Sequence, residues 1–300
     1  RDLVRSRGLG DVYKRQGYYK QLKKWCNKRG MYFVGHLLFE ESLWVHARCG
    51  GNLFQMLRNL DVVGTDHLYP KIGTDDEPNE HVPLKIASSA AHHFGSPRVL
   101  CESLGGTYWD CTMARMKWIA DWEYVLGVNL FNPHGFHYSI SDERKRDWPP
   151  SQFYHHPWWK HYKHFADYML RLSYMLSGGR HVAKIAMLYP MANMWANYLP
   201  NPGRHGFNMT LCEKTFNYLT NRLLQLHYDF DYVDEDVLAE AKVKDGKLQI
   251  ADEEYELFIL PPVTHVKRST LDKMEQFLKG GGRVLAGGML PSEDTDGKNI

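Results

Sequence analysis

Glu102 is the residue whose position is best suited to chemistry. It follows a short apolar segment, Arg98–Cys101, and precedes a glycine turn at Gly105 and Gly106. A carboxylate at the carboxyl end of a buried parallel strand is where (β/α) barrel enzymes carry their catalytic groups. We therefore interpret Glu102 as a base or nucleophile. The competing interpretation is a structural ion pair at the end of a strand.

Cleavage of a glycosidic bond requires two carboxyl groups, one on each side of the anomeric carbon. Glu40 and Glu41 end the first predicted strand and are the candidates for the partner acid. Side chains alternate along a strand, so only one of the two points inward, and we favour Glu40. Two alternatives stay open: a solvated pair without a catalytic role, and an acid on strands that this chain lacks.

Further polar and aromatic residues lie close to the predicted strand ends, where they could bind a sugar. Asp66 could hold a hydroxyl group or a metal ion, or could pair with Lys71. Each histidine could line a pocket, pack or cap. Beyond the glycine turn, an indole could stack on a sugar and a carboxylate could accept two hydroxyl protons. The predicted substrate-binding set is His36, Glu41, Asp66, His67, Tyr69, Trp109, Asp110, Asn132, His134 and His137.

No established metal or nucleotide motif occurs in the chain. HExxH, GxSxG, P-loop and EF-hand spacings are all absent from the sequence. The five cysteines form no CxxC pair, and scattered histidines do not by themselves make a metal site. We expect no cofactor, and a divalent cation such as calcium stays open.

The composition excludes several classes of partner. The net charge is +2 and the basic residues form no long stripe, which argues against nucleic acid. No apolar run is long enough to span a membrane. The aromatic content of 13% fits rings that stack on sugars, and it fits a large aromatic core equally well.

Helical and strand patterns alternate from Tyr18 onward, which predicts a parallel sheet. Four βα repeats are half of an eight-stranded barrel, so we expect an α/β fold, the C-terminal half of a (β/α)8 TIM barrel. A long loop over Ser139–Pro157 and a closing helix over Pro157–Ser177 should follow. The predicted helices and strands of the repeats are Tyr18–Lys28, Met31–Phe39, Asn52–Asn59, Asp61–Tyr69, Val82–Phe94, Val99–Ser103, Thr112–Leu126 and Gly127–Pro133.

A second, doubly wound α/β domain is predicted to begin near His181. We divide the chain into a leader of doubtful origin (1–16), the half-barrel (17–180) and the second domain (181–300). Half a barrel exposes apolar strand edges, so we expect this chain alone to be inactive and prone to aggregation. Cytoplasmic, periplasmic and secreted locations all stay open.

Several linked segments resemble bacterial glycoside hydrolases related to the alpha-L-rhamnosidases of family 106. They are FVGHLLFEESLW, GTDHLYPK, KIASSAAHHFGSPRVLCESLGGTYWD and DWEYVLGVNLFNPHGF, and the resemblance covers about Trp25 to Tyr198. It implies that Glu102 is the glutamate of the next-to-last barrel strand, the nucleophile or base of related enzymes such as the family 42 beta-galactosidases. The acid of such families lies on the fourth strand, which this chain lacks, and that puts Glu40 in doubt.

The resemblance also implies an amidotransferase-like domain over His181–Gly288, used for packing or for contacts between subunits of a homo-oligomer. The expected function is hydrolysis of a terminal sugar from an oligo- or polysaccharide, with an alpha-L-rhamnoside as the first candidate and a beta-galactoside as the second. A non-catalytic carbohydrate-binding or assembly protein is the alternative. An amidotransferase-type enzyme is disfavoured, because Cys212 falls within a predicted helix.

Overall fold

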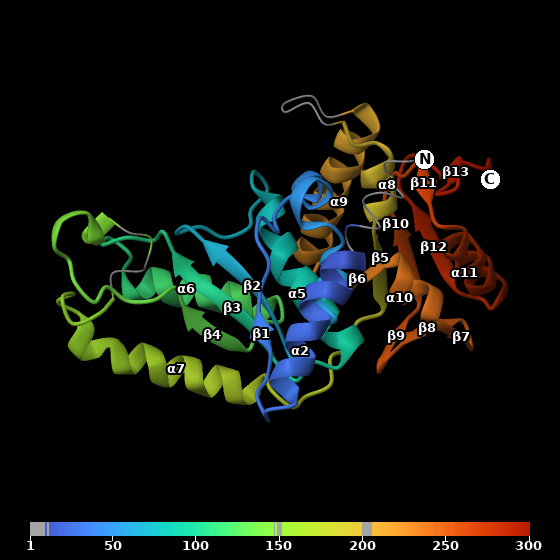
Figure 1. The fold of residues 1–300 in the computed structure, drawn as a ribbon. Coiled ribbons are helices and arrows are strands. Elements are labelled where there is room, and N and C mark those ends of the chain that lie inside the picture. The colour runs from blue at the N-terminus through green and yellow to red at the C-terminus, as the bar shows by residue number, and fades with distance from the viewer. Residues whose placement is uncertain (1–9, 11, 147, 149–151, 200–205) are drawn as a thin grey trace.

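Two parallel sheets lie side by side in the computed structural model, which describes residues 10, 12–146, 148, 152–199 and 206–300 (Figure 1). The first sheet has the strand order β1-β2-β3-β4 and the second the order β12-β10-β5-β6. Their strands are β1 (Val34–Gly35), β2 (Val62–Leu68), β3 (Val99–Gly105), β4 (Leu130–Pro133), β5 (Ile185–Tyr189), β6 (Phe230–Asp234), β10 (Leu257–Leu260) and β12 (Arg283–Ala286).

The first sheet has the strand order expected for half of a (β/α) barrel. Its register sets Asp66, Glu102 and Asn132 side by side on three neighbouring strands. Cys101 and Ser103 alternate with Glu102 and are fully buried. Because side chains alternate across a strand, Glu102 lies on the opposite face from these two residues.

Helix α5 (His81–Phe94) packs against both sheets. Nearly all of its side chains are buried, and in Figure 1 it lies between β2 and β6. It ends at Gly95, whose φ of +68° is the left-handed conformation that glycine adopts without strain. One helix therefore contributes to the cores of the half-barrel and of the second α/β unit.

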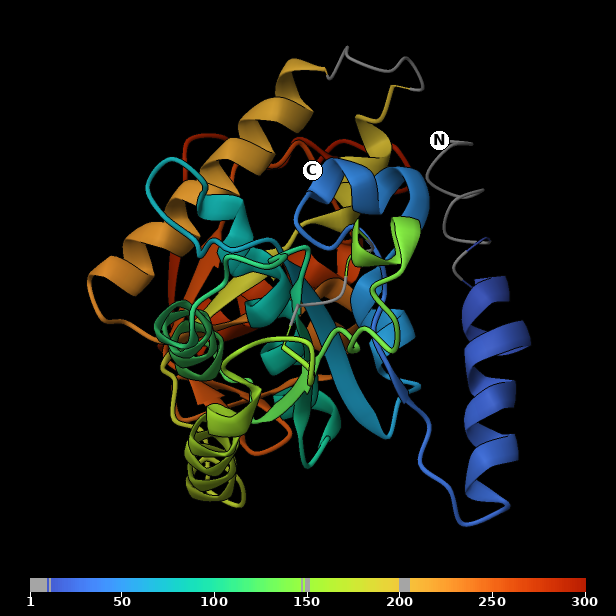
Figure 2. The same ribbon diagram turned by 90° about the vertical axis from the view of Figure 1, so that its left-hand side faces the viewer.

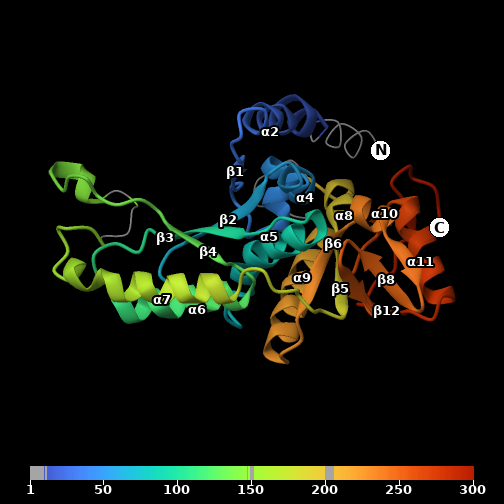
Figure 3. The same cartoon turned by 90° about the horizontal axis from the view of Figure 1, so that it is seen from below.

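Other helices cover the half-barrel. Helices α6 and α7 run beside each other along it, as Figure 3 shows. Thr112 caps α6, because its side chain accepts a hydrogen bond from the backbone N–H of Arg115. The helical elements up to α7 are η1 (Lys14–Tyr19), α2 (Lys20–Asn27), α3 (Leu43–Val45), η2 (His46–Gly50), α4 (Leu53–Leu57), η3 (Pro78–Glu80), α6 (Met113–Val125), η4 (Asp142–Arg146), η5 (Trp159–His161) and α7 (Tyr162–Met175).

The second unit adds two small sheets to its parallel one. Strands β7, β8 and β9 form a three-stranded antiparallel sheet in that order, and β11 and β13 form a two-stranded sheet. The remaining elements are α8 (Met191–Ala196), α9 (Phe207–Gln225), α10 (Glu235–Glu240), β7 (Lys242–Lys244), β8 (Lys247–Ile250), β9 (Glu253–Tyr255), β11 (His265–Val266), α11 (Arg268–Lys279) and β13 (Glu293–Asp294).

One predicted strand differs from the structure, and two other predictions fall partly outside the described residues. The predicted strand Met31–Phe39 is a strand only at Val34–Gly35, and Phe39 has a φ of +60° that breaks an extended run. The supposed leader 1–16 includes helical residues, because η1 begins at Lys14, while residues 1–9 and 11 lie outside the described part. Parts of the predicted loop Ser139–Pro157 (147 and 149–151) also lie outside it.

Helix α2 stands apart from the rest of the half-barrel beyond β1 (Figure 2). It has no buried residue, and Trp25 is 52% exposed. Nearby, Tyr32, Leu38 and Phe39 are also exposed. Apolar surface is therefore exposed at the edge of the first sheet formed by β1. Among the described residues, no helix combines the length and apolar character needed to cross a lipid bilayer.

Candidate active site

Glu102 lies at the centre of a cluster on the first sheet, held by two imidazole groups. His36 Nε2 is 2.5 Å from Glu102 Oε2, and His134 Nδ1 is 2.5 Å from Glu102 Oε1. The two histidines follow the strands at opposite edges of the sheet, one after β1 and one after β4. A carboxylate has only acceptor oxygens, so both ring nitrogens donate to it. The Glu102 carboxylate side chain is 26% exposed, which leaves it accessible to a ligand.

His36 carries a proton on both ring nitrogens. Its Nδ1 is 2.5 Å from the carbonyl oxygen of Leu37, while its Nε2 faces Glu102. Both neighbours accept hydrogen bonds, so both nitrogens must donate, and the ring is an imidazolium. Burial lowers the pKa of His36, but the negative charge of Asp66 and the hydrogen bonds to Glu102 and to the Leu37 carbonyl outweigh burial and raise it.

The imidazolium keeps Glu102 ionised. Partial burial raises the pKa of Glu102, but hydrogen bonds from His134 and His36 outweigh it, so the net shift is downward. A carboxylate that stays charged is suited to act as base or nucleophile and unsuited to donate a proton.

Asp66 is the second carboxyl group of this cluster. Its Oδ2 lies 3.8 Å from His36 Nδ1. Burial raises the pKa of Asp66 to about 6, the charges of Glu41 and Glu102 add to the rise, and His36 opposes it. Asp66 and Glu102 therefore titrate at different pH, because their environments shift the two pKa values in opposite directions.

Glycines after Glu102 make room for its neighbours. A Cβ on Gly105 would collide with Leu68 Cδ2 and lie 3.2 Å from the ring of His134, and a Cβ on Gly106 would lie 2.9 Å from the indole of Trp148. Trp148 in turn contacts the Tyr69 ring, with the centroids 5.1 Å apart. The glycine turn thus lets His134 reach Glu102 and lets an aromatic pair form beside the site.

The backbone around the site is strained. Phe39, Tyr69, Leu104 and Tyr108 all have positive φ values between 54° and 75°, and all lie at or just beyond the carboxyl ends of β1, β2 and β3. Residues other than glycine avoid this region, and such strain concentrates at functional sites. These positive φ values support a functional site at the carboxyl ends of the strands.

Glu40, the acid favoured from the sequence, is engaged inside the protein. One carboxyl oxygen accepts a hydrogen bond of 2.7 Å from the Leu37 backbone N–H, and the other accepts one from the Thr65 hydroxyl. The side chain is buried, and burial raises its pKa to about 8, with the Asp66 charge adding to the rise. Glu40 therefore keeps its proton at neutral pH.

The Glu40→Gln variant is expected to lose less stability than the unsubstituted protein as the pH rises. Between the ordinary pKa of 4.5 and about 8, the unfolded chain has lost this proton while the folded chain keeps it. The free energy of unfolding of the unsubstituted protein should therefore fall by up to about 1.4 kcal/mol per pH unit across this window, relative to the variant. Urea unfolding of both proteins at pH 5, 6.5 and 8 measures the difference.

Two outcomes of that experiment would contradict the assignment. A stability difference that does not grow with pH would mean that Glu40 is ionised in the folded protein. A loss of glycosidase turnover by more than about 100-fold in a stably folded variant would make Glu40 the catalytic acid after all.

The other sequence-predicted residues divide between the cluster and its surroundings. Asn132 is exposed and lies level with Glu102. Tyr69 directly follows β2, whereas Glu41 lies in the turn between β1 and α3. His67 is buried against Trp122 of α6, on the face opposite Asp66, and burial lowers its pKa to about 4. The structure therefore does not bring His67 to Glu102.

Trp109 and its neighbours form a separate aromatic group in the loop region. The indole lies parallel to the rings of His137 and His156, at centroid distances of 5.6 and 6.2 Å. Its Nε1 donates to the carbonyl oxygen of Lys145. These contacts engage Trp109 and His137 in loop packing, while Asp110 is exposed to solvent.

Glu123, which was not predicted from the sequence, contacts β3 from the side that α6 covers. It lies on α6, is fully buried, and accepts a 2.8 Å hydrogen bond from the Ser103 hydroxyl. Burial raises its pKa to about 8, so it keeps its proton. In the sequence, Glu123 is a single glutamate on the inner face of a predicted helix. That pattern alone does not show whether the side chain is buried or exposed.

A family model described as alpha-L-rhamnosidase, glycoside hydrolase family 106, matches residues 4–296. This chain belongs to that family. A protein of Formosa agariphila named "Putative beta-glucuronidase" is 26% identical over 286 residues, which are 93% of this chain and 21% of the relative. The family 106 chain therefore spans about a fifth of that protein's length.

Solved structures show the same fold. A rhamnosidase from Novosphingobium sp. PP1Y matches with a TM-score of 0.64 and 20% identity, covering 90% of this family 106 chain and 25% of that one. A beta-galactosidase from Rahnella sp. R3 matches with a TM-score of 0.62 and 17% identity, covering 95% and 42%. These likenesses confirm the expected mixed α/β architecture, shared with barrel glycosidases.

Proposed function

We propose that the protein containing this chain hydrolyses a terminal glycosidic bond, with Glu102 as its base or nucleophile. The observation that carries the proposal is the pair of imidazole donors on Glu102, which keep the carboxylate ionised while it stays partly exposed. A glycosidase needs one such carboxylate beside the anomeric carbon. Family membership supports the same class of reaction.

The neighbours of Glu102 suit a sugar. Asp66 and Asn132 flank it in register on β2 and β4. A carboxyl and an amide group at that level can accept hydrogen bonds from hydroxyl groups, and the amide can also donate. The Tyr69–Trp148 pair, with both rings partly exposed, offers an apolar face at the edge of the cluster.

The proton donor is proposed to lie outside this chain. Glu40 has both oxygens occupied by internal hydrogen bonds, and Glu102 is held in its ionised form. The matched relatives are several times longer than this chain, and we place the acid in the part of the whole protein that this chain does not cover. Calcium or another divalent cation at this cluster stays an open prediction.

An alpha-L-rhamnoside is the proposed first substrate, because the family model carries that description. The test is a panel of nitrophenyl glycosides offered to the full-length protein, including alpha-L-rhamnoside, beta-galactoside and beta-glucuronide. We expect release of nitrophenol from the rhamnoside at a rate at least tenfold above the others. A preference for another member would revise the sugar and keep the reaction class.

Hydrolysis of no member, together with saturable binding of the same sugars, would favour the alternative of a carbohydrate-binding or assembly protein. The amidotransferase alternative gains no support, because Cys212 is buried within α9 and burial raises the pKa of its thiol to about 12. A thiol in that state is a poor nucleophile. An amidotransferase-like fold and an oligomer formed through the second domain remain predictions.

A further inference from the structure

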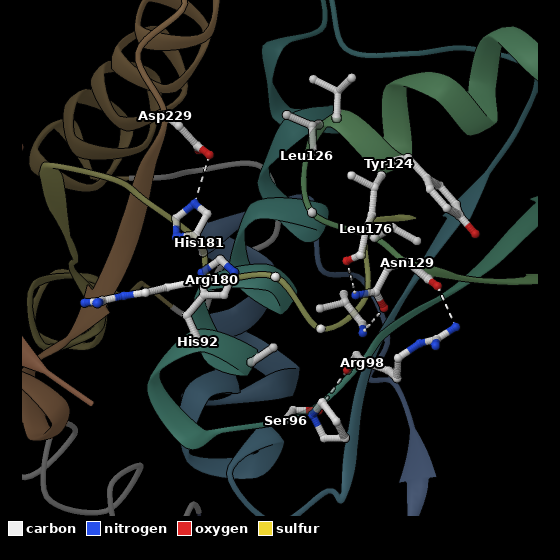
Figure 4. A pocket seen from close by; sticks show the side chains of 18 of the residues that line it. His92, Ser96, Arg98, Tyr124, Leu126, Asn129, Leu176, Arg180, His181 and Asp229 are labelled. Atoms are coloured by element: carbon white, nitrogen blue, oxygen red, sulfur yellow. Dashed lines mark hydrogen bonds and ion pairs between the residues drawn. The ribbon is translucent and has the colours of Figure 1, made fainter. Parts of the chain in front are cut away.

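A second cluster of ionisable groups lies at the junction of the two sheets, near the amino ends of β3 and β4. It joins His92 of α5, His181 of the segment before β5, Asp231 of β6 and Glu253 of β9. Figure 4 shows His92 and His181 beside each other at this junction, with Asp229 above them. They lie toward the amino ends of the strands, at the opposite end from Glu102, and take no part in the proposed hydrolysis.

The donor atoms of His92, His181 and Asp231 are spaced as ligands of one small cation are, and Glu253 adjoins them at His181. His92 Nδ1 is 3.0 Å from Asp231 Oδ1, and His181 Nδ1 is 3.5 Å from Asp231 Oδ2 and 3.2 Å from Glu253 Oε2. The ligand atoms of the two histidines and Asp231 all lie within 4.8 Å of one another. Zinc bonds of 2.0–2.2 Å in tetrahedral geometry put neighbouring ligand atoms about 3.4 Å apart.

The groups behind these atoms hold them in place. His181 Nε2 is 2.9 Å from Asp229 Oδ2, and Asp229 is paired with Lys85 at 2.8 Å. On the other side, Asp231 Oδ2 accepts a 2.8 Å hydrogen bond from the Tyr255 hydroxyl. A carboxylate on the far nitrogen of a histidine and a donor on a ligating carboxylate are the outer contacts that metal ligands usually have.

The charges of the cluster favour a divalent cation. With neutral imidazole rings, the carboxylates Asp229, Asp231 and Glu253 exceed the single ammonium of Lys85 by two negative charges. Two imidazolium rings could balance them, but the rings of His92 and His181 are stacked at a centroid distance of 3.9 Å and an angle of 14°. Two positive rings at that distance repel each other. Without an ion, His181 alone donates from both ring nitrogens, to Asp229 and to Glu253, and balances one of the two charges. One divalent ion would displace the proton on Nδ1 and neutralise the whole excess.

A route to the cluster exists on one side. His92, His181 and Asp229 line a cavity of about 350 Å³ between the two sheets, whereas Asp231 and Glu253 are buried beneath. The cavity is large enough for a hydrated ion to approach before it loses its water. The proposed ligands come from α5, from the segment that connects the two units, from β6 and from β9.

We propose that His92, His181, Asp231 and Glu253 form a structural site for a zinc-type divalent cation that fastens the half-barrel to the second α/β unit. Two imidazole nitrogens and two carboxylate oxygens suit zinc better than calcium or magnesium, which prefer oxygen alone. His181 belongs to the segment that connects the two units, so the bound ion would also hold that connecting segment in place.

The test is titration of the chelator-treated full-length protein with Zn²⁺ alone, followed by calorimetry and thermal unfolding. We expect a tight site, nanomolar or better, and a rise in Tm on binding. Both His181→Asn and Asp231→Asn should weaken that site at least 100-fold, and Asp229→Asn, which alters only the outer contact, should weaken it about 10- to 100-fold. Co²⁺ in place of zinc should give the visible absorption of a tetrahedral site, which His181→Asn abolishes.

His227→Asn is the matched control. His227 is exposed and has a φ of +60°, a conformation that asparagine also tolerates, so this variant should bind zinc as tightly as the unsubstituted protein. Circular dichroism shows whether each variant is folded, and His92→Asn, at the partly exposed rim, replaces any variant that is not. Equal zinc affinity in the unsubstituted protein and in folded His92 and His181 variants would overturn the proposal, as would the absence of a tight site.

Discussion

Replacing Glu102 by glutamine is expected to lower kcat on the preferred aryl glycoside by about 10³-fold or more, while the protein stays folded. Glutamine keeps the size of the side chain and removes the charge that would take a proton or attack the anomeric carbon. Steady-state kinetics of the full-length protein and its Glu102→Gln variant measure the loss. The first-formed anomer, followed by NMR with the unsubstituted enzyme, assigns the role: retention indicates a nucleophile and inversion indicates a base.

The control for this experiment is Glu143→Gln, which alters an exposed glutamate in η4 that pairs with Arg146. It should leave kcat within about twofold, as expected for a solvated pair. A folded Glu102→Gln variant with near-unsubstituted turnover would remove Glu102 from the reaction.

Replacing His36 by asparagine is expected to move the acidic limb of the pH profile of kcat/KM to higher pH. The hydrogen bonds from His134 and His36 lower the pKa of Glu102, and the charge of His36 lowers it further. Without the imidazolium the carboxylate takes up a proton at higher pH, so the ionised fraction at a given acidic pH falls. We expect kcat/KM at pH 5 to drop about 10- to 100-fold and to recover in part at pH 7.

The pH profile separates this role from simple packing. A structural defect would lower activity by the same factor at every pH, whereas loss of the imidazolium moves the limb. His164→Asn, on the exposed side of α7, should reproduce the unsubstituted profile. An unchanged acidic limb in the His36 variant would show that another group sets the ionisation of Glu102.

Local sequence patterns were enough to place Glu102. The strand β3, its glycine turn and the helices on either side follow from apolar runs, a proline and glycines, all of which act within a few residues. His36 and His134 were expected near the pocket, but their hydrogen bonds to the same carboxylate are contacts across the sheet. No local pattern specifies such a contact, because it depends on the register of four strands.

Glu40 shows where strand alternation fails. The apolar run before it suggested a long strand that ends with Glu40 pointing inward. The strand stops at Gly35, and the positive φ of Phe39 redirects the chain so that Glu40 bonds to Thr65. A rule based on alternation holds only as long as the backbone stays extended.

The His92–His181–Asp231 cluster was missed for a different reason. Its members come from a helix, a connecting segment and a strand, separated by dozens of residues, so they form no spaced motif. The cluster also lies toward the amino ends of the strands, whereas catalytic groups are expected at the carboxyl ends of parallel strands. Only the packing of α5 between the sheets brings these groups together.

The position of α5 has a thermodynamic consequence. Its Ser89 hydroxyl accepts the backbone N–H of Tyr232 in β6, while its other side packs against β2 and β3. Unfolding of either sheet would remove part of the packing around this helix and expose a nearly all-buried element to water. The half-barrel and the unit that follows it should therefore lose their structure in a single cooperative transition, so that the proposed boundary near residue 180 divides the chain in topology but not in stability.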